Sequence, residues 1–206
     1  MATFSMTFLF LFLSLALGKV SAHSAITTHN ASGWDFINQN YSLNLIKRNF
    51  DPSGGHNATN CTSAFTVWKN VSDHTSYQTL KYYNMTASSW VTVNETFHFY
   101  NKSGIYDYMN ASSITGGSPG SYQFLYADVN CSVVQVFSVH FETRERINAA
   151  MERSLEEPNK TLCHQWVKNG TTVTAECNNF FETNCDNSTI YHDYNDTCTS
   201  LRTGTT

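Results

Sequence analysis

The chain has 206 residues, with 12 basic and 16 acidic side chains, and a formal net charge of −4. This length suits one ordinary domain with room for a sizeable core. The charge balance and the lack of a basic stripe argue against nucleic acid as a partner.

Residues 1–22 are predicted to be a secretory signal peptide. The apolar run FLFLFLSLALG is too short for a membrane span, and Val20-Ser21-Ala22 follows it as a cleavage pattern of small residues. Cleavage there makes His23 the first mature residue and leaves residues 23–206 as a single domain. No later apolar run is long enough for a membrane helix, so we expect a secreted protein without a membrane anchor.

The next elements along the chain indicate a mostly β protein. Residues 32–50 have apolar side chains near helical spacing and then an extended run, which predicts a short helix leading into a strand. A turn over 51–55 follows. Short aromatic and β-branched runs separated by Gly, Pro, Asn and Ser then predict strands in a sandwich or barrel, over 63–69, 79–86, 90–100, 104–109, 121–128, 132–141, 163–167 and 171–176.

Two later segments have a different pattern. Residues 144–159 are highly charged and are predicted to be helical. Residues 176–185 are consistent with a short helix that carries Phe180 and Phe181. We therefore expect one or two helices at the periphery of the β structure.

The cysteines indicate an oxidising compartment. All six follow the predicted signal peptide, and an even number in a secreted chain predicts three disulfides. Zinc is the rival interpretation, but no Cys-x-x-Cys or Cys-x-x-His pair occurs, so we expect no metal site. Spacing alone leaves the pairing open among Cys61, Cys131, Cys163, Cys177, Cys185 and Cys198.

Asn-x-Ser/Thr sequons are far more frequent than composition alone would give, which predicts a heavily glycosylated surface. Asn60 and Asn130 precede cysteines, and we expect these sequons to be used less; a further sequon begins at Asn30. The predicted glycosylation sites are Asn40, Asn57, Asn70, Asn84, Asn94, Asn101, Asn110, Asn159, Asn169, Asn187 and Asn195.

Enzyme signatures are missing from the sequence. It has no Gly-x-Ser-x-Gly, His-Glu-x-x-His, P-loop or Gly-x-Gly-x-x-Gly motif, and its eight histidines show no paired spacing. A mature chain starting at His23 is similar to copper-dependent polysaccharide monooxygenases, but signal cleavage also leaves terminal histidines by accident. We therefore predict a protein that is not an enzyme and has no cofactor.

The run from Trp90 to Tyr100 carries the strongest site signal. Side chains alternate along a strand, so Val93, Glu95 and Phe97 share one face and the Asn94 sequon lies on the other. A glycan must point to solvent, which directs Glu95 inward. An ionised carboxylate is costly there unless paired, and its natural partner is a cation. The alternatives are an internal salt bridge to Lys or Arg, or a bulge that turns Glu95 out.

Aromatic residues strengthen this interpretation. Tyr106 and Tyr108 share a face on the next run. A ring over a cation contributes roughly 0.5–2 kcal/mol, although aromatic side chains are more often plain core. A carboxylate among rings suggests a cup for a small organic amine, and Phe97 shares the inward face with Glu95.

The ordered set of signals resembles the tick salivary lipocalins of the histamine-binding family. It comprises GWDFINQNY, an Asp51-Pro52 turn before Cys61, ADVNCSVV around Cys131, and CHQWV followed by Cys177 and Cys198. The resemblance covers residues 33–198. It implies an eight-stranded antiparallel lipocalin (calycin) barrel with flanking helices and a ligand cup. It also implies the disulfides Cys61–Cys198 and Cys131–Cys177, which leaves Cys163–Cys185.

The resemblance implies a ligand site as well. Histamine binders use acidic residues in two internal pockets, and Asp51 and Glu95 fall on acidic positions of one pocket. Tyr106 and Tyr108 fall on its aromatic wall. The second pocket does not carry over, because its acidic positions read Ser132, His164 and, nearby, Tyr122.

Three functions follow as expectations. The first is capture of a host amine such as histamine or serotonin, by which feeding ticks blunt inflammation. The second is binding of a lipid mediator such as a leukotriene, a fatty acid or cholesterol. The third is engagement of a host immune protein, for which residues 144–159 are a candidate surface. We expect a monomer, since no odd cysteine is left for a covalent dimer.

Overall fold

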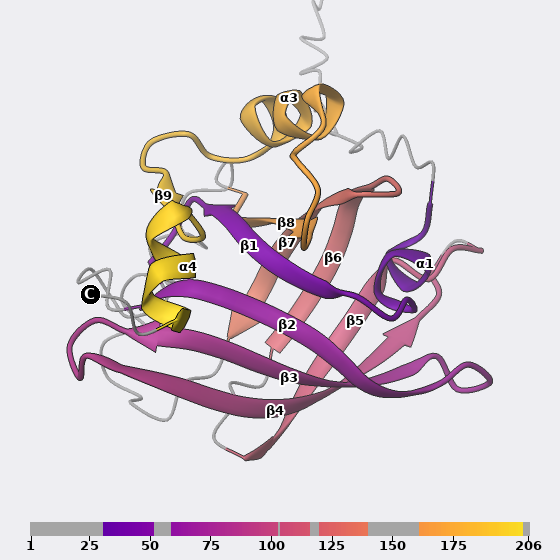
Figure 1. Ribbon diagram of the computed structural model, residues 1–206. Coiled ribbons are helices and arrows are strands. Elements are labelled where there is room, and N and C mark those ends of the chain that lie inside the picture. Colours follow the sequence, from indigo (N-terminus) through magenta and orange to yellow (C-terminus); the bar gives the residue numbers. More distant parts are fainter. Residues whose placement is uncertain (1–30, 52–58, 103, 116–119, 140–160, 204–206) are drawn as a thin grey trace, which may run out of the picture.

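Eight antiparallel strands close into a barrel in the computed structural model, which describes residues 31–51, 59–102, 104–115, 120–139 and 161–203 (Figure 1). Neighbours along the chain pair with one another, and β1 closes the barrel by pairing with both β2 and β8. This confirms the expected lipocalin fold. The strands are β1 (Ser42–Arg48), β2 (Thr59–Asn70), β3 (Thr75–Asn84), β4 (Ser89–Tyr100), β5 (Tyr108–Thr115), β6 (Gly120–Ala127), β7 (Cys131–Val139) and β8 (Cys163–Lys168).

The predicted signal peptide and the predicted helix over 144–159 lie outside the described residues. A short ninth strand, β9 (Tyr191–His192), adds to β1 beside the barrel. Among the described residues, no helix is long and apolar enough to cross a membrane.

The short helix α1 (Gly33–Ile37) packs against β6 at one end of the barrel. Ser32 and Asp35 form a capping box that satisfies the first backbone N–H groups of this helix. Gly33 has no room for a side chain, because a Cβ there would lie 2.3 Å from the Phe124 ring. Phe36 and Ile37 of this helix are buried at the end of the barrel interior. The short helix followed by a strand is the arrangement predicted for residues 32–50.

The helix α3 (Ala175–Asn184) covers the outer face of β6 and β7 (Figure 1). It confirms the expected short helix, and its Phe181 is fully buried. The strand predicted over 171–176 is wrong, because Thr174 accepts a hydrogen bond from the Cys177 N–H and begins the helix. A third described helix, α4 (Asp196–Thr203), lies near the start of β2.

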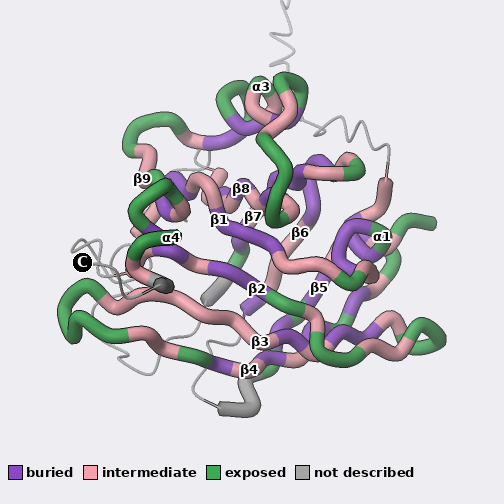
Figure 2. Tube along the Cα trace, viewed as in Figure 1, coloured by how far each residue is buried: buried purple, intermediate pink, exposed green. Residues whose placement is uncertain are grey.

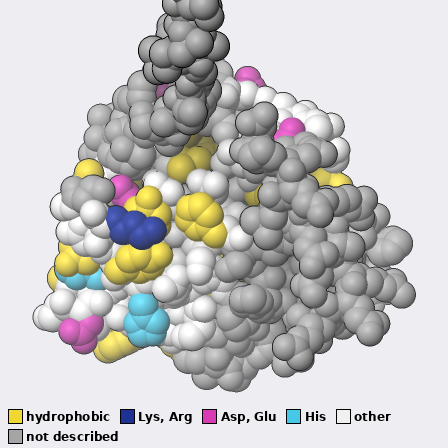
Figure 3. Space-filling model, turned by 180° about the vertical axis from the view of Figure 1, so that it is seen from behind, with side chains coloured by type: hydrophobic (Ala, Val, Ile, Leu, Met, Phe, Trp, Pro, Cys, Tyr) yellow, Lys and Arg dark blue, Asp and Glu magenta, His cyan; other side chains and the backbone are white. Residues whose placement is uncertain are grey.

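Apolar side chains pack on both faces of the sheet where α3 lies outside it, so the protein has two apolar clusters. One apolar cluster fills the barrel interior, and the other lies between β6–β8 and α3. Buried residues follow the strands, whereas exposed residues gather at the hairpin turns (Figure 2). Seen from behind, one basic patch lies among hydrophobic side chains on the described surface (Figure 3).

Three disulfides hold the chain together, and they are the pairs that the family resemblance implies. Cys61–Cys198 ties β2 to α4. The other two, Cys131–Cys177 and Cys163–Cys185, attach the two ends of α3 to the starts of β7 and β8. The segment 162–177 therefore holds one strand and the start of a helix, not the two strands predicted over 163–167 and 171–176.

Candidate functional site

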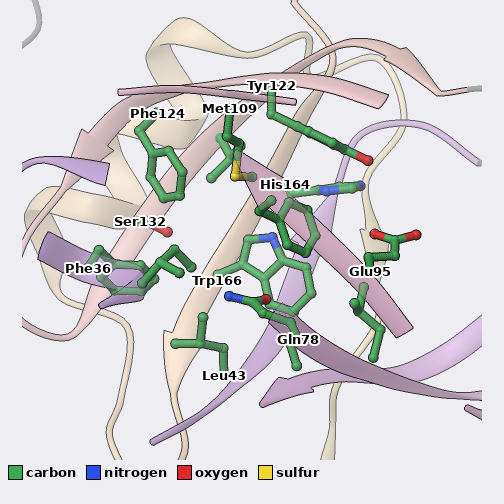
Figure 4. Close-up of a pocket in the computed structure, with 15 residues that line it drawn as sticks. Phe36, Leu43, Gln78, Glu95, Met109, Tyr122, Phe124, Ser132, His164 and Trp166 are labelled. Carbon is green, nitrogen blue, oxygen red and sulfur yellow. The ribbon is translucent and has the colours of Figure 1, made fainter. Parts of the chain in front are cut away.

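The barrel interior contains a cavity with an empty volume of about 530 Å³ including its mouth (Figure 4). Residues from α1 and every barrel strand form its wall: Phe36, Ile37, Leu43, Ala64, Gln78, Leu80, Glu95, Phe97, Met109, Tyr122, Phe124, Ser132, Val134, His164 and Trp166.

Glu95 lies in the middle of β4, and its side chain faces this cavity (Figure 4). The residue is 5% exposed, and Val93 and Phe97 on the same face are also buried. The inward orientation expected from the Asn94 sequon is thus confirmed. An irregularity in the β4–β5 register does occur between Asn94 and Glu95, but it does not turn Glu95 outward.

Two neutral hydrogen-bonding side chains lie at the same end of the cavity as Glu95 (Figure 4). Burial, and then the negative charge of Glu95, raise the pKa of Tyr122, so its phenol stays protonated. Burial, and then the positive charge of Arg48, lower the pKa of His164 to about 3. At neutral pH this end of the cavity therefore offers a phenol and an uncharged imidazole beside the Glu95 side chain.

Rings and aliphatic side chains make up most of the remaining wall. Phe97 and Tyr122 approach with ring centroids 6.4 Å apart, and Trp166 meets His164 edge-on at 6.1 Å. The described lining contains no Lys or Arg, and Glu95 is its one carboxylate. Such a wall suits a flat organic group whose charge, if any, is positive.

Asp51, predicted to share the pocket with Glu95, lies elsewhere. Its side chain is 4% exposed and pairs with Arg48, with 3.5 Å between Oδ1 and Nη1. Arg48 also pairs with Asp193 at 3.1 Å. Asp51 is not among the described residues that line the cavity. Its carboxylate lies instead beside the buried guanidinium of Arg48, at the end of β1.

The two tyrosines expected on the aromatic wall also lie outside the cavity lining. The Tyr106 ring stacks on His74, with centroids 3.6 Å apart. The Tyr108 ring stacks on Tyr100, and Lys102 Nζ lies 4.0 Å from its centroid. Of the predicted ligand-binding residues, the structure brings Glu95 and Phe97 together in the cavity.

Ser132, His164 and, nearby, Tyr122 replace the acidic positions of the family's second pocket, and all three line the cavity. They share one cavity with Glu95. Strand alternation is the sequence signal that could locate them. On β8, Cys163 and Val167 pack toward α3, so His164 and Trp166 must face inward.

The comparisons with known proteins agree with this architecture. The sequence matches the family model described as tick histamine binding protein over residues 22–200. The chain belongs to this family. Within the described residues, no group of three or more His, Cys, Asp or Glu side chains could hold a metal ion.

The fold of this chain is also similar to that of a solved tick protein. Japanin from Rhipicephalus appendiculatus, in a crystal structure bound to cholesterol, aligns with a TM-score of 0.51 and 13% sequence identity. The alignment covers 79% of this chain and 98% of Japanin. At this identity the likeness shows the fold alone. A search among curated proteins found no match. The family and the fold together make this chain a tick lipocalin that binds small ligands.

Proposed function

We propose that this lipocalin is a secreted glycoprotein that captures a host inflammatory amine, such as histamine, and so helps a feeding tick to evade host defence. The observation that carries the proposal is Glu95, a buried carboxylate in a cavity whose described wall is otherwise neutral. The function is sequestration rather than catalysis.

Binding would follow from the arrangement of charge and rings. The ammonium of the amine pairs with the Glu95 carboxylate, and a charge-assisted hydrogen bond of this kind is strong when water is excluded. The ring of the ligand lies against Phe97 and Trp166. Tyr122 and His164 complete the polar end without adding a positive charge that would repel the amine.

Calorimetric titration with histamine tests the proposal. We expect saturable binding by the wild-type protein and a loss of at least about 100-fold in affinity for Glu95→Gln, because the ion pair is replaced by a neutral contact. Glu176→Gln removes an equal charge from the exposed part of α3 and should bind like the wild type. If wild type and Glu95→Gln give the same affinity, or neither binds at millimolar histamine, the amine proposal is wrong.

A second candidate is a lipid mediator. The cavity end near Phe36, Met109 and Phe124 is apolar, and the structurally similar Japanin is described as bound to cholesterol. A fatty carboxylate is disfavoured, because the described wall has one carboxylate and no Lys or Arg. Native mass spectrometry of the secreted protein would reveal a retained lipid. A lipid that histamine cannot displace would favour this second function.

A further inference from the structure

The hydroxyl of Ser132 has no hydrogen-bond partner in the structure. Ser132 is fully buried on β7, and its Oγ is one of three buried side-chain polar atoms without a partner among the described residues. The other two belong to Asn38 and Gln165, neither of which lines the cavity. Buried hydroxyls are nearly always satisfied, so this one requires an explanation.

The place of Ser132 in the cavity supplies that explanation. Its oxygen lies beside Phe36 and Phe124, at the end opposite Glu95 (Figure 4). The cavity therefore has a carboxylate at one end, rings and aliphatic groups along its length, and an unused hydroxyl at the other end.

We propose that Ser132 is a second ligand anchor, which selects an aromatic monoamine with a neutral hydroxyl on the ring end remote from the ammonium. The inference rests on the proposed amine function and names the chemical class of ligand. Serine both donates and accepts a hydrogen bond, so it suits a ring hydroxyl. A second ammonium would find no carboxylate there, since Glu95 is the one carboxylate of the described wall.

Tyramine and phenylethylamine form a matched pair of probes, because they differ by one ring hydroxyl. The full-length secreted protein should bind tyramine about tenfold more tightly than phenylethylamine, as one buried hydrogen bond would give. Ser132→Ala should bind both with the affinity that the wild type has for phenylethylamine, so the preference falls to about one. Glu95→Gln should weaken both probes together.

A glycan control is needed, because Ser132 completes the sequon that begins at Asn130. Asn130→Gln removes the same sequon and keeps the hydroxyl, so it should retain the tenfold preference for tyramine. Without ligand, Ser132→Ala should melt no more than about 1 °C below the wild type, since the hydroxyl has no partner in the protein. A fall of several degrees would overturn the proposal by showing that the hydroxyl is bonded internally.

The outcomes separate this inference from the proposed function. If both probes bind equally in wild type and depend on Glu95, amine capture stands and the Ser132 anchor is overturned. If tyramine is preferred and Ser132→Ala keeps that preference, another residue recognises the hydroxyl and the anchor is again overturned. If neither probe nor histamine binds, both the function and the anchor fail.

Discussion

His164 lines the cavity and lies close to the positive charge of Arg48. Its ring stacks on Phe50, with centroids 4.9 Å apart, and meets Trp166 edge-on. Arg48 is the positive charge that disfavours its protonation, and Glu95 and Tyr122 share the cavity wall with it. These surroundings keep the imidazole neutral, so under the amine proposal it would not compete with the ligand ammonium for Glu95.

This arrangement predicts a pH dependence of stability. Burial lowers the pKa of His164 to about 3 from its usual 6.5, so below pH 6.5 the unfolded chain gains a proton that the folded chain does not. The contribution of His164 to the free energy of unfolding therefore falls as the pH drops from 6.5 toward 3. At pH 5 the loss should be up to about 2 kcal/mol relative to pH 7.5.

Denaturant unfolding at pH 7.5 and at pH 5 gives the free energy of unfolding at each pH, and the difference between the two values measures this effect. His164→Gln cannot titrate, so it should lose less stability than wild type over the same interval. His192→Gln, a change at an exposed histidine on β9, serves as the matched control and should behave like the wild type. Equal losses in the wild type and His164→Gln would show that His164 titrates normally.

At the scale of elements, β4 and β8 show how far the residue pattern alone predicts the site. On β4 a solvent-facing sequon and a regular alternation are enough to predict the inward direction of Glu95. The same alternation holds on β8, but α3 covers the outer face of this strand. Both faces of β8 therefore carry apolar residues, and the sequence does not show which face points into the barrel. The inward position of His164 and Trp166 depends on that long-range packing.

The attachment of α3 gives an element-scale prediction. Cys163–Cys185 closes a loop with a sequence separation of 22 residues, and a loop of that length stabilises a fold by roughly 3 kcal/mol. Replacing both cysteines by alanine should lower the melting temperature by roughly 6–12 °C. Histamine affinity should change less than about twofold, because α3 lies outside the barrel. Calorimetry of melting and of binding measures both, and a large loss of affinity would tie α3 to the cavity.

At the scale of the whole molecule, contacts with the C-terminal segment explain why Asp51 lies away from its predicted pocket. The Arg48 guanidinium lies between the carboxylates of Asp51 and Asp193, and it also donates to the Thr59 carbonyl at 2.9 Å. Asp193 lies 142 residues beyond Asp51 in sequence. Cys61–Cys198 holds this C-terminal segment against β2. No local sequence pattern predicts such a contact, so the family resemblance alone is an insufficient guide to the position of Asp51.

Tyr106 and Tyr108 lie away from the predicted aromatic wall for a related reason. They follow the loop after β4, and only Tyr108 enters β5. The Tyr106 carbonyl accepts a hydrogen bond from the Trp34 N–H at 3.0 Å, which holds this segment against α1 rather than in the cavity wall. Tyrosines would suit an amine site, but the residue pattern does not specify the register at which β5 begins.

The sequons give a last expectation that concerns the entire surface. Among the described residues, every sequon asparagine is exposed or half-buried, and none lines the cavity. Asn94 is the informative case, since it shares β4 with Glu95 but faces away from the interior. A glycan there would lie outside the barrel, with the sheet between it and the ligand.

Enzymatic removal of N-glycans, followed by peptide mass spectrometry, identifies the occupied asparagines. We expect occupancy at Asn94 and at the exposed Asn40, Asn101, Asn110, Asn169, Asn187 and Asn195, and less at the cysteine-adjacent Asn60 and Asn130. The deglycosylated protein should bind histamine with unchanged affinity, because the ligand is enclosed by the strands. It should also be less soluble, because the described surface carries exposed apolar side chains such as Phe65 and Trp68, which are 47% and 56% exposed. A large change of affinity would place a glycan at the mouth of the cavity, and that would make glycosylation part of ligand capture.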